Sequence, residues 1–195
     1  MSELMFRAVS FSTNNSTFSS ISIMKQYIMT AECSDIKYVK DNHVTFKHKL
    51  LLENGSQLEC ANSYYEITSL SKSSKACEKA DCFIIFFDLE YTESILELNK
   101  ILKYIKETCD TEKKIFLINI YTVENNIKSN FTDDNLKSIF SNYTLQNYDI
   151  SMVNMDSLDE LAKIIDSLTE ETLREKKLLN KNLDIDNSKS NCLII

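Results

Sequence analysis

The sequence predicts an α/β domain built on a mostly parallel, six-stranded sheet with one antiparallel hairpin and helices on both faces. Two observations predict this fold class. The dipeptide Asn54-Gly55 is the strongest short hairpin signal, and it lies between two strand-like segments early in the chain. After the hairpin, strand-like and helix-like segments alternate, which indicates repeated strand–helix units and therefore parallel strands.

The first half of the chain predicts three strands and one helix. A short apolar strand covers residues 6–11, and residues 19–29 have the apolar spacing of a helix. Residues 44–52 alternate apolar and polar side chains, as a half-buried strand does, and residues 57–61 return as its partner. Gly55 is the only glycine of the chain, and we expect it at the turn position that needs a left-handed backbone.

The second half predicts three further strands and three helices. The run Phe-Ile-Ile-Phe-Phe at residues 83–87 is apolar throughout, as in a parallel strand buried on both faces. Amphipathic helical spacing follows it, and the same alternation continues to the end of the domain. The predicted segments are strands 83–87, 115–120 and 149–153 and helices 92–107, 133–143 and 157–174.

The composition is that of one soluble globular domain: 195 residues, of which 43% are hydrophobic and 26% charged. The net charge of -7 disfavours a nucleic-acid partner. The six cysteines form no C-x-x-C pair, and we expect them to be reduced thiols. His43 and His48 are isolated in the sequence, which favours surface or hairpin positions over a metal site.

The chain ends Cys192-Leu193-Ile194-Ile195, the C-a-a-X pattern for prenylation of the cysteine. Residues 182–191 are polar, which suits a flexible stalk between a folded domain and a lipid. The sequence therefore divides into a domain at residues 1–177 and a flexible tail at residues 178–195. The competing interpretation is an apolar chain end with an incidental cysteine.

Two segments resemble the Ras-like small GTPases. Residues 80–88, Ala-Asp-Cys-Phe-Ile-Ile-Phe-Phe-Asp, followed by Thr-Glu-Ser-Ile at residues 92–95, look like the family's fourth strand and third helix. Residues 44–47, Val-Thr-Phe-Lys, look like the start of the second strand in the Rab branch. The resemblance covers residues 6–174 and the tail, and it implies a Ras-like P-loop GTPase fold with about five helices.

The family's phosphate loop reads G-x-x-x-x-G-K-S/T after the first strand. Ser12 and Thr17 stand where the two glycines let the backbone approach phosphate, and Phe18 stands where the lysine neutralises it. Only Ser19 keeps the family's residue type, as a vestigial magnesium ligand. A cradle rich in glycine is also excluded by the single glycine of the chain. The resemblance therefore implies a degenerate phosphate site.

The remaining nucleotide motifs are altered as well. Residues 62–66 align with the family's D-x-x-G-Q motif. In this alignment Asn62 replaces the aspartate, Tyr65 replaces the glycine, and Glu66 replaces the glutamine that orients water. In the family, an N-K-x-D motif reads the guanine base and an S-A-K motif supports it. In this alignment only the serine of S-A-K keeps the family's residue type. The residues that align with these two motifs are Ile120, Val123 and Ser151.

These replacements lead to the expectation of a membrane-anchored, Ras-like or Rab-like pseudo-GTPase that acts through protein–protein contact in signalling or vesicle trafficking. Its expected location is the cytoplasmic face of a membrane, with a cytosolic pool. Its expected partners are effector or regulatory proteins and a prenyl-binding carrier, with no cofactor and no catalytic residue. The candidate partner surface comprises Val44, Phe46, Tyr64 and Tyr65.

Without nucleotide, the rings of Phe18, Tyr64 and Tyr65 are expected to fill the vacated pocket. Three alternatives stay open. The first alternative is a divergent but active small GTPase that binds GTP or GDP with magnesium and hydrolyses GTP slowly. The second alternative is a prenylated α/β protein of unrelated function. The third alternative is a generic α/β sheet without Ras-like ancestry.

Overall fold

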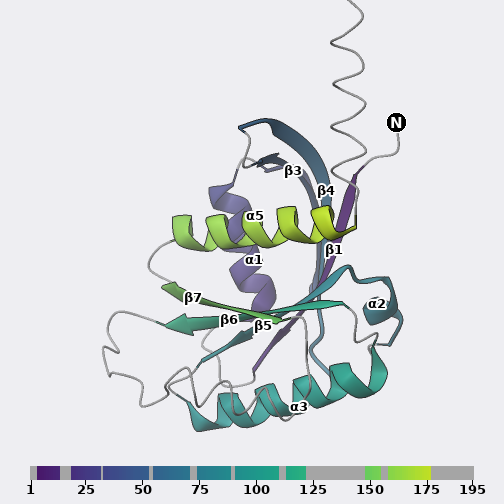
Figure 1. The fold of residues 1–195 in the computed structure, drawn as a ribbon, viewed down its shortest axis with the longest axis vertical. Coiled ribbons are helices and arrows are strands. Elements are labelled where there is room, and N and C mark those ends of the chain that lie inside the picture. The colour runs from purple at the N-terminus through teal and green to yellow at the C-terminus, as the bar shows by residue number, and fades with distance from the viewer. Residues whose placement is uncertain are drawn as a thin grey trace, which may run out of the picture.

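The computed structural model describes residues 4–13, 19–31, 33–52, 55–70, 74–88, 91–109, 113–121, 148–154 and 158–176. In these residues, seven strands form one sheet and four helices flank it (Figure 1). The strands are β1 (Met5–Ser12), β2 (Cys33–Lys40), β3 (His43–Leu51), β4 (Gln57–Glu66), β5 (Cys82–Phe87), β6 (Lys114–Tyr121) and β7 (Tyr148–Asn154). The helices are α1 (Ser20–Thr30), α2 (Ser74–Lys79), α3 (Thr92–Thr108) and α5 (Leu158–Glu175).

The strands lie in the order β2-β3-β4-β1-β5-β6-β7. β4, β1, β5, β6 and β7 run parallel, while β2, β3 and β4 form an antiparallel meander at one edge. The five parallel strands therefore follow the doubly wound order 2-1-3-4-5. The chain crosses from one side of β1 to the other between β4 and β5, so the carboxyl ends of β1 and β5 form the topological switch point, where such sheets bind ligands.

Each face of the sheet buries its own apolar core. All six side chains of β5 are buried, as the apolar run predicts. Ile84 and Phe86 lie in the core beneath α1 and α5, whereas Phe83 and Phe87 lie in the core beneath α3. Figure 1 shows these helices on opposite sides of the sheet. The predicted mostly parallel sheet with helices on both faces is thus confirmed.

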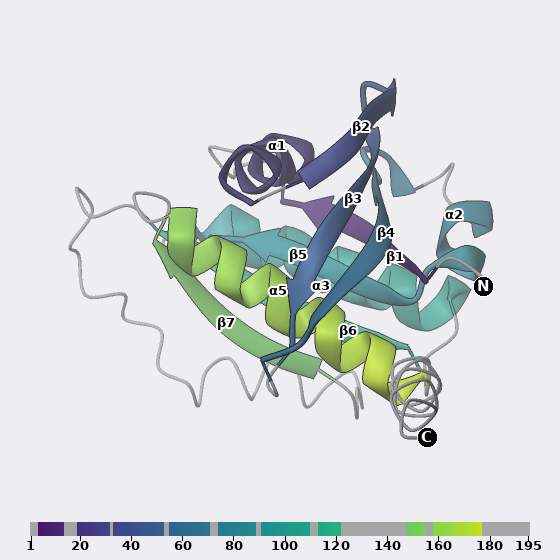
Figure 2. The ribbon, with the colours of Figure 1, turned by 90° about the horizontal axis from the view of Figure 1, so that it is seen from above.

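The sheet differs from the prediction by one strand. Residues 33–40 form β2, an antiparallel edge strand beside α1 (Figure 2). Seven of its eight residues are exposed. The hydrophobic pattern therefore does not single this segment out as a strand. The prediction of six strands is one too few.

The helices also differ from the prediction. The described residues hold four helices, fewer than the expected count of about five. The predicted helix at residues 133–143 lies outside the described residues. The short helix α2 was not predicted, because its six residues are too few for an apolar period to be recognised.

The predicted hairpin is confirmed, and its second strand is longer than expected. Gly55 has a φ of +79° in the turn between β3 and β4, the left-handed conformation that glycine tolerates. The strand β4 continues beyond residue 61 because it pairs in parallel with β1, from the Met5–Ala61 pair to the Ser10–Glu66 pair. This pairing carries Glu66 to the carboxyl end of β1.

Candidate functional site

The candidate site lies at the topological switch point, where β1 leads toward α1. Ser19 is the N-cap of α1, and its Oγ accepts a hydrogen bond from the backbone N–H of Ser22 at 3.3 Å. The first backbone N–H groups of a helix have no partner within the helix, and the helix dipole makes this end favourable for a negative charge. In phosphate-binding α/β proteins this is where phosphate lies.

In this chain a carboxylate from β4 lies at that position. Glu66 is 4% exposed, and its Oε1 accepts hydrogen bonds from the backbone N–H of Ser20 at 2.8 Å, from Ser20 Oγ at 2.8 Å and from Ser12 Oγ at 3.2 Å. Because the Ser20 hydroxyl donates to Glu66, it accepts from Ser10 Oγ at 2.9 Å. One carboxylate therefore joins the ends of β1 and β4 to the first turn of α1.

The backbone of Glu66 is held from the other side. Its N–H donates to the Asn42 carbonyl at 2.8 Å, and the Asn42 side-chain amide donates to the Glu66 carbonyl at 3.0 Å. Asn42 lies in the turn between β2 and β3. The position of the carboxylate is thus fixed by contacts on both its side chain and its main chain.

A second group of hydrogen bonds joins β1 to β5 and α3. The backbone N–H of Thr13 donates to the Phe86 carbonyl at 3.2 Å, and its hydroxyl shares a 2.7 Å hydrogen bond with Ser94 Oγ. Ser94 Oγ also accepts from the backbone N–H of Asp88 at 2.8 Å. Thr13 and Ser94 are both buried, so side chains of the protein itself occupy the space between the two strand ends.

A pocket of about 440 Å³ opens beside Glu66. Its described lining includes two acidic residues, Glu66 and Glu97, and no lysine, arginine or histidine. It is lined by Phe11, Ser12, Thr13, Ser19, Glu66, Ile67, Thr68, Ser69, Leu70, Glu97 and Ile101. A pocket with this charge is a poor match for a triphosphate, whose binding depends on charge-assisted contacts from cations and backbone N–H groups.

Part of the predicted nucleotide site lies elsewhere. Asn62 is in the middle of β4, paired with Phe6 near the start of β1, and its side chain donates to the Cys60 carbonyl at 3.0 Å. Ile120 is a core residue of β6. The alignment of Asn62 with a metal-supporting aspartate at the strand end is therefore not supported, because β4 runs on for four more residues.

Five predicted site residues lie wholly or partly outside the described residues. The backbone of Ser151 lies in β7, and its side chain is outside the described residues. The remaining predicted positions outside the described residues are Thr17, Phe18, Val123 and Cys192.

The structure differs from the expectation that Val44, Phe46 and Tyr64 form a partner surface. All three are at most 2% exposed, because the alternation of β3 and β4 points them into the core beneath α1 and α5. Tyr64 stacks on Phe46 with ring centroids 5.7 Å apart, so it does not fill the vacated pocket. Tyr65 is half-buried and packs edge-on against His43. Among the described residues, Glu66 is the one whose side chain contacts the first turn of α1 from β4.

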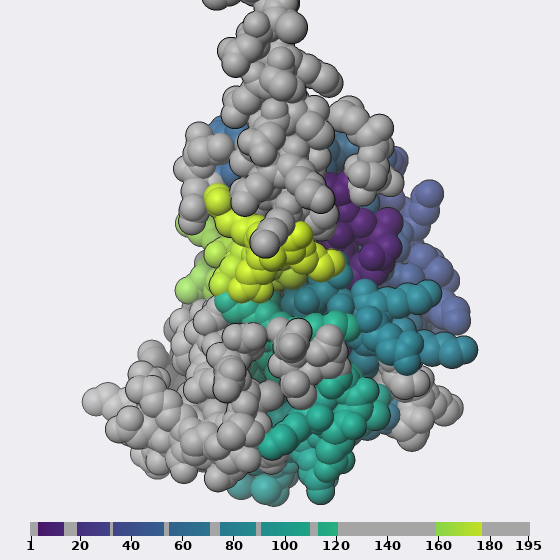
Figure 3. Space-filling view, turned by 45° about the vertical axis from the view of Figure 1, so that its right-hand side comes forward, coloured from purple at the N-terminus to yellow at the C-terminus, as the bar shows by residue number. Residues whose placement is uncertain are grey.

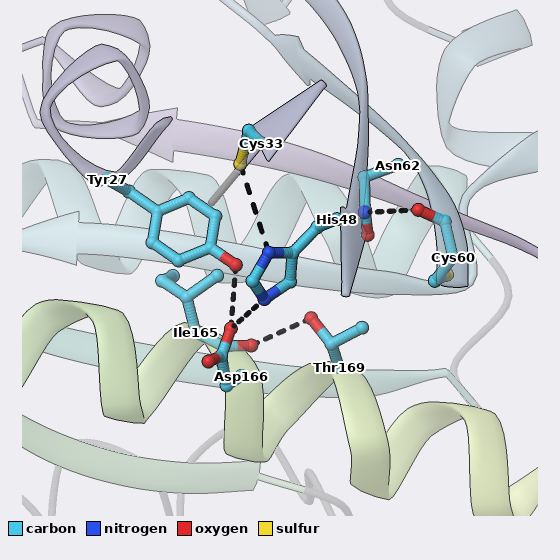
Figure 4. A network of polar contacts seen from close by, with 8 residues as sticks. All are labelled: Tyr27, Cys33, His48, Cys60, Asn62, Ile165, Asp166 and Thr169. Carbon is cyan, nitrogen blue, oxygen red and sulfur yellow. Dashed lines mark hydrogen bonds and ion pairs between the residues drawn. The ribbon is translucent and has the colours of Figure 1, made fainter. Parts of the chain in front are cut away.

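A polar network beneath α1 and α5 was not predicted (Figure 4). His48 lies in the hairpin strand β3, as one of the two expected positions has it, but it is only 7% exposed, and its Nε2 lies 3.1 Å from Asp166 Oδ1. The same oxygen accepts from the Tyr27 hydroxyl at 2.7 Å, and Cys33 Sγ lies 4.0 Å from His48 Nδ1. These residues are far apart in the sequence, so no spacing could reveal the cluster.

The network has the Cys–His–Asp order of a thiol nucleophile but not its electrostatics. Burial and the Asp166 carboxylate raise the pKa of the Cys33 thiol to about 12, so the thiol stays protonated at neutral pH. The 4.0 Å contact with His48 is at the long limit for a sulfur hydrogen bond. We therefore interpret the network as a structural connection between α1, β3 and α5.

Comparison with protein-family models and with curated proteins finds no match to this chain. Within the described residues no cluster of histidine, cysteine, aspartate and glutamate side chains has the arrangement of a metal site. No helix of the described part is long and apolar enough to cross a membrane.

Proposed function

We propose that this chain is a small-GTPase-like interaction protein that does not bind nucleotide. The observation that carries this proposal is the Glu66 carboxylate at the N-terminus of α1. It receives the backbone and hydroxyl donors that a phosphate would need there. GTP would have to displace a buried, hydrogen-bonded anion from its own site.

Electrostatics support the same conclusion. A phosphate charge about 4 Å from a carboxylate is repelled by about 4 kcal/mol at the effective dielectric constant of about 20 that is typical near a protein surface. Glu97 adds a second acid to the described pocket lining, which offers no basic side chain to compensate. The described residues therefore do not fit GTP with magnesium.

The same contacts supply a fixed conformation. In Ras-like GTPases, contacts to the γ-phosphate order the switch loops, and hydrolysis releases them. Here Glu66 and Asn42 join α1, β4 and the β2–β3 turn through the protein's own hydrogen bonds. We infer a protein held in one binding-competent state, whose contacts with partners do not depend on nucleotide.

The partner surface that we propose is the edge strand β2. Ile36, Tyr38 and Val39 are exposed apolar side chains on the strand that ends the described part of the sheet, and an edge strand accepts a further strand from another protein. Lys37 and Lys40 lie on the same strand, in a chain whose net charge is -7. We therefore expect an extended, acidic segment of an effector or regulatory protein as the occupant.

We further propose that a prenyl group on Cys192 holds the protein at the cytoplasmic face of a membrane, in the manner of Rab-like and Ras-like proteins in signalling or trafficking. A prenyl-binding carrier would maintain the cytosolic pool. The support for this anchor is the terminal C-a-a-X sequence alone.

Nucleotide content tests the proposal. Protein purified without added nucleotide is denatured, and the released nucleotides are separated by chromatography and quantified. We expect no GDP or GTP in stoichiometric amount. Recovery of about one guanine nucleotide per chain would instead establish the divergent, active GTPase.

A further inference from the structure

The pocket beside Glu66 contains one carboxylate oxygen that the fold does not use. All three hydrogen bonds to the Glu66 side chain, from Ser12 and Ser20, go to Oε1. Oε2 makes no hydrogen bond within the described residues, and it is not one of their fully buried oxygens that lack a partner. Glu66 lines the pocket, so Oε2 is reached from the pocket even though the residue as a whole is 4% exposed.

The charge at this oxygen stays negative despite the helix terminus beside it. The N-terminus of a helix carries about half an elementary positive charge, so α1 offsets only part of the Glu66 carboxylate. Glu97 of α3 adds a second acidic side chain to the lining. Among the described lining residues no lysine, arginine or histidine opposes these two acids. The pocket therefore favours a cation.

A second acceptor lies next to this carboxylate. Ser12 Oγ donates its proton to Glu66 Oε1 at 3.2 Å, so its lone pairs are directed away from that bond. Ser12 also lines the pocket. An ammonium group has three N–H donors, so it can donate to the carboxylate and to the hydroxyl together. Such charge-assisted hydrogen bonds are roughly twice as strong as neutral ones.

The remaining lining suits a carbon stem. Phe11, Ile67, Leu70 and Ile101 contribute apolar side chains. The volume of about 440 Å³ lies within the range of sites for small organic molecules, which combine apolar walls with a few placed polar groups. Magnesium and calcium ions bind almost entirely through oxygen, so a metal ion would leave the apolar walls without a partner.

The two kinds of lining lie at different depths along α3. Figure 3 shows α3, in green-teal, at the surface of the molecule. Glu97 is half-buried, whereas Ile101, one turn further along the helix, is 3% exposed. Both residues line the pocket. A ligand that enters beside α3 would therefore meet an acidic side chain near the surface and apolar side chains deeper in.

We propose that this pocket binds an organic cation, a primary ammonium group on an apolar stem. The ammonium donates to Glu66 Oε2 and to Ser12 Oγ, Glu97 adds to the attraction, and the stem packs against Phe11 and Ile101. Free alkylamines and the lysine side chain of another protein share this chemistry. The inference goes beyond the absence of nucleotide binding and is tested separately, because an amine that fails to bind leaves the result with GTP unchanged.

Three ligands with the same apolar body test the charge preference. Phenylbutylamine, phenylbutanol and phenylbutyrate carry a cationic, a neutral and an anionic group at the same position. Isothermal titration calorimetry with the full chain at low ionic strength measures each affinity. We expect the amine to bind at least about tenfold more tightly than the alcohol, and the carboxylate not to bind. Equal affinity for the amine and the alcohol, or displacement of the amine by magnesium chloride at matched ionic strength, would overturn the proposal.

Variants of the lining locate the bound amine. Glu66→Gln keeps an oxygen for Ser20 and removes the charge, so it should weaken amine binding at least about tenfold and leave the alcohol unaffected. Glu97→Gln should weaken amine binding by a smaller factor, and it provides the test if circular dichroism shows Glu66→Gln to be unfolded. Glu93→Gln is the matched control, because Glu93 is an exposed residue of α3 outside the described lining. Unchanged affinity in the folded lining variants, or an equal loss in Glu93→Gln, would contradict the proposed site.

A blocked amino acid separates the two sources of the ammonium. N-acetyl-lysine amide presents the group as a protein side chain does, and N-acetyl-norleucine amide is its neutral counterpart. Preferential binding of the lysine compound would support a lysine of another protein as the occupant. Binding of phenylbutylamine alone would support a small-molecule amine. Binding of neither cation would overturn the proposal.

Discussion

Glu66 links three parts of the chain that a nucleotide holds together in Ras-like GTPases. Its carboxylate accepts from both the backbone and the hydroxyl of Ser20, and from Ser12. The resemblance aligns Glu66 with the family's glutamine, although Asn62 of the same motif lies in the middle of β4 rather than at its end. It does not indicate the new role, because Ser20 is 46 residues away and the contact exists only once β4 extends along β1.

Replacement of Glu66 is expected to destabilise the fold. Glu66→Ala removes the acceptor for three donors, two of them on the buried Ser20, and a donor left unsatisfied in the interior costs about 1–3 kcal/mol. We expect the free energy of unfolding, measured by urea denaturation, to fall by about 2–4 kcal/mol. Glu59→Ala is the control on the same strand, since Glu59 is 59% exposed. Its loss should stay within about 0.5 kcal/mol, and equal losses would mean that the Glu66 contacts do not support the fold.

Among the elements, α5 depends on a contact that crosses the core. Asp166 accepts from Tyr27 of α1 and contacts His48 of β3. The long apolar pattern of α5 predicted the helix correctly. It did not predict the partners of Asp166, because a lone histidine and a lone acid carry no signal in one sequence.

Asp166→Ala is expected to weaken the docking of α5. The buried Tyr27 hydroxyl and His48 imidazole lose a shared acceptor, and we expect a fall of about 2–3 kcal/mol in the free energy of unfolding. Asp159→Ala, in the exposed first turn of α5, is the matched control and should lose at most about 1 kcal/mol, the size of a helix-dipole contribution. Urea denaturation measures both, and a smaller loss for Asp166→Ala than for Asp159→Ala contradicts the structural interpretation of the network.

The edge strand β2, which like α2 was not predicted from the sequence, is also the proposed partner surface. A photo-crosslinking amino acid at Tyr38 should capture an acidic partner protein in cells, because its side chain is exposed on the edge strand of the described sheet. The same group at Leu96 is the control, since Leu96 is equally exposed but lies on α3, across the sheet from α1. Equal capture from both positions would remove β2 as the specific surface.

For the whole molecule, the sequence predicted the parallel sheet, both helical faces and the hairpin because these depend on local patterns. The apolar run of β5 and the turn at Gly55 carry that information directly. What it did not predict depends on tertiary contact: the exposed strand β2, the Glu66 carboxylate at α1, and the contact of His48 with Asp166. Each of these joins segments that no periodicity connects.

The membrane anchor is a prediction at the same scale. A single prenyl chain gives only marginal membrane affinity, and the four lysines between residues 176 and 191 are offset by two aspartates. We expect weak, reversible association, and Cys192→Ser should move the protein wholly to the cytosolic fraction. Unchanged membrane fractionation of this variant would show that the terminal cysteine is not the anchor.

The most direct test of the central claim is thermal unfolding with and without about 1 mM GTP and excess magnesium. A site with micromolar affinity would be stabilised by about 4 kcal/mol at that concentration, which corresponds to a rise of about 10 °C in the unfolding temperature of a domain of this size. With Glu66 at the N-terminus of α1, we predict a change below about 1 °C, the result for a ligand that does not bind the folded state. A rise of several degrees would contradict the proposal and establish a nucleotide-binding protein.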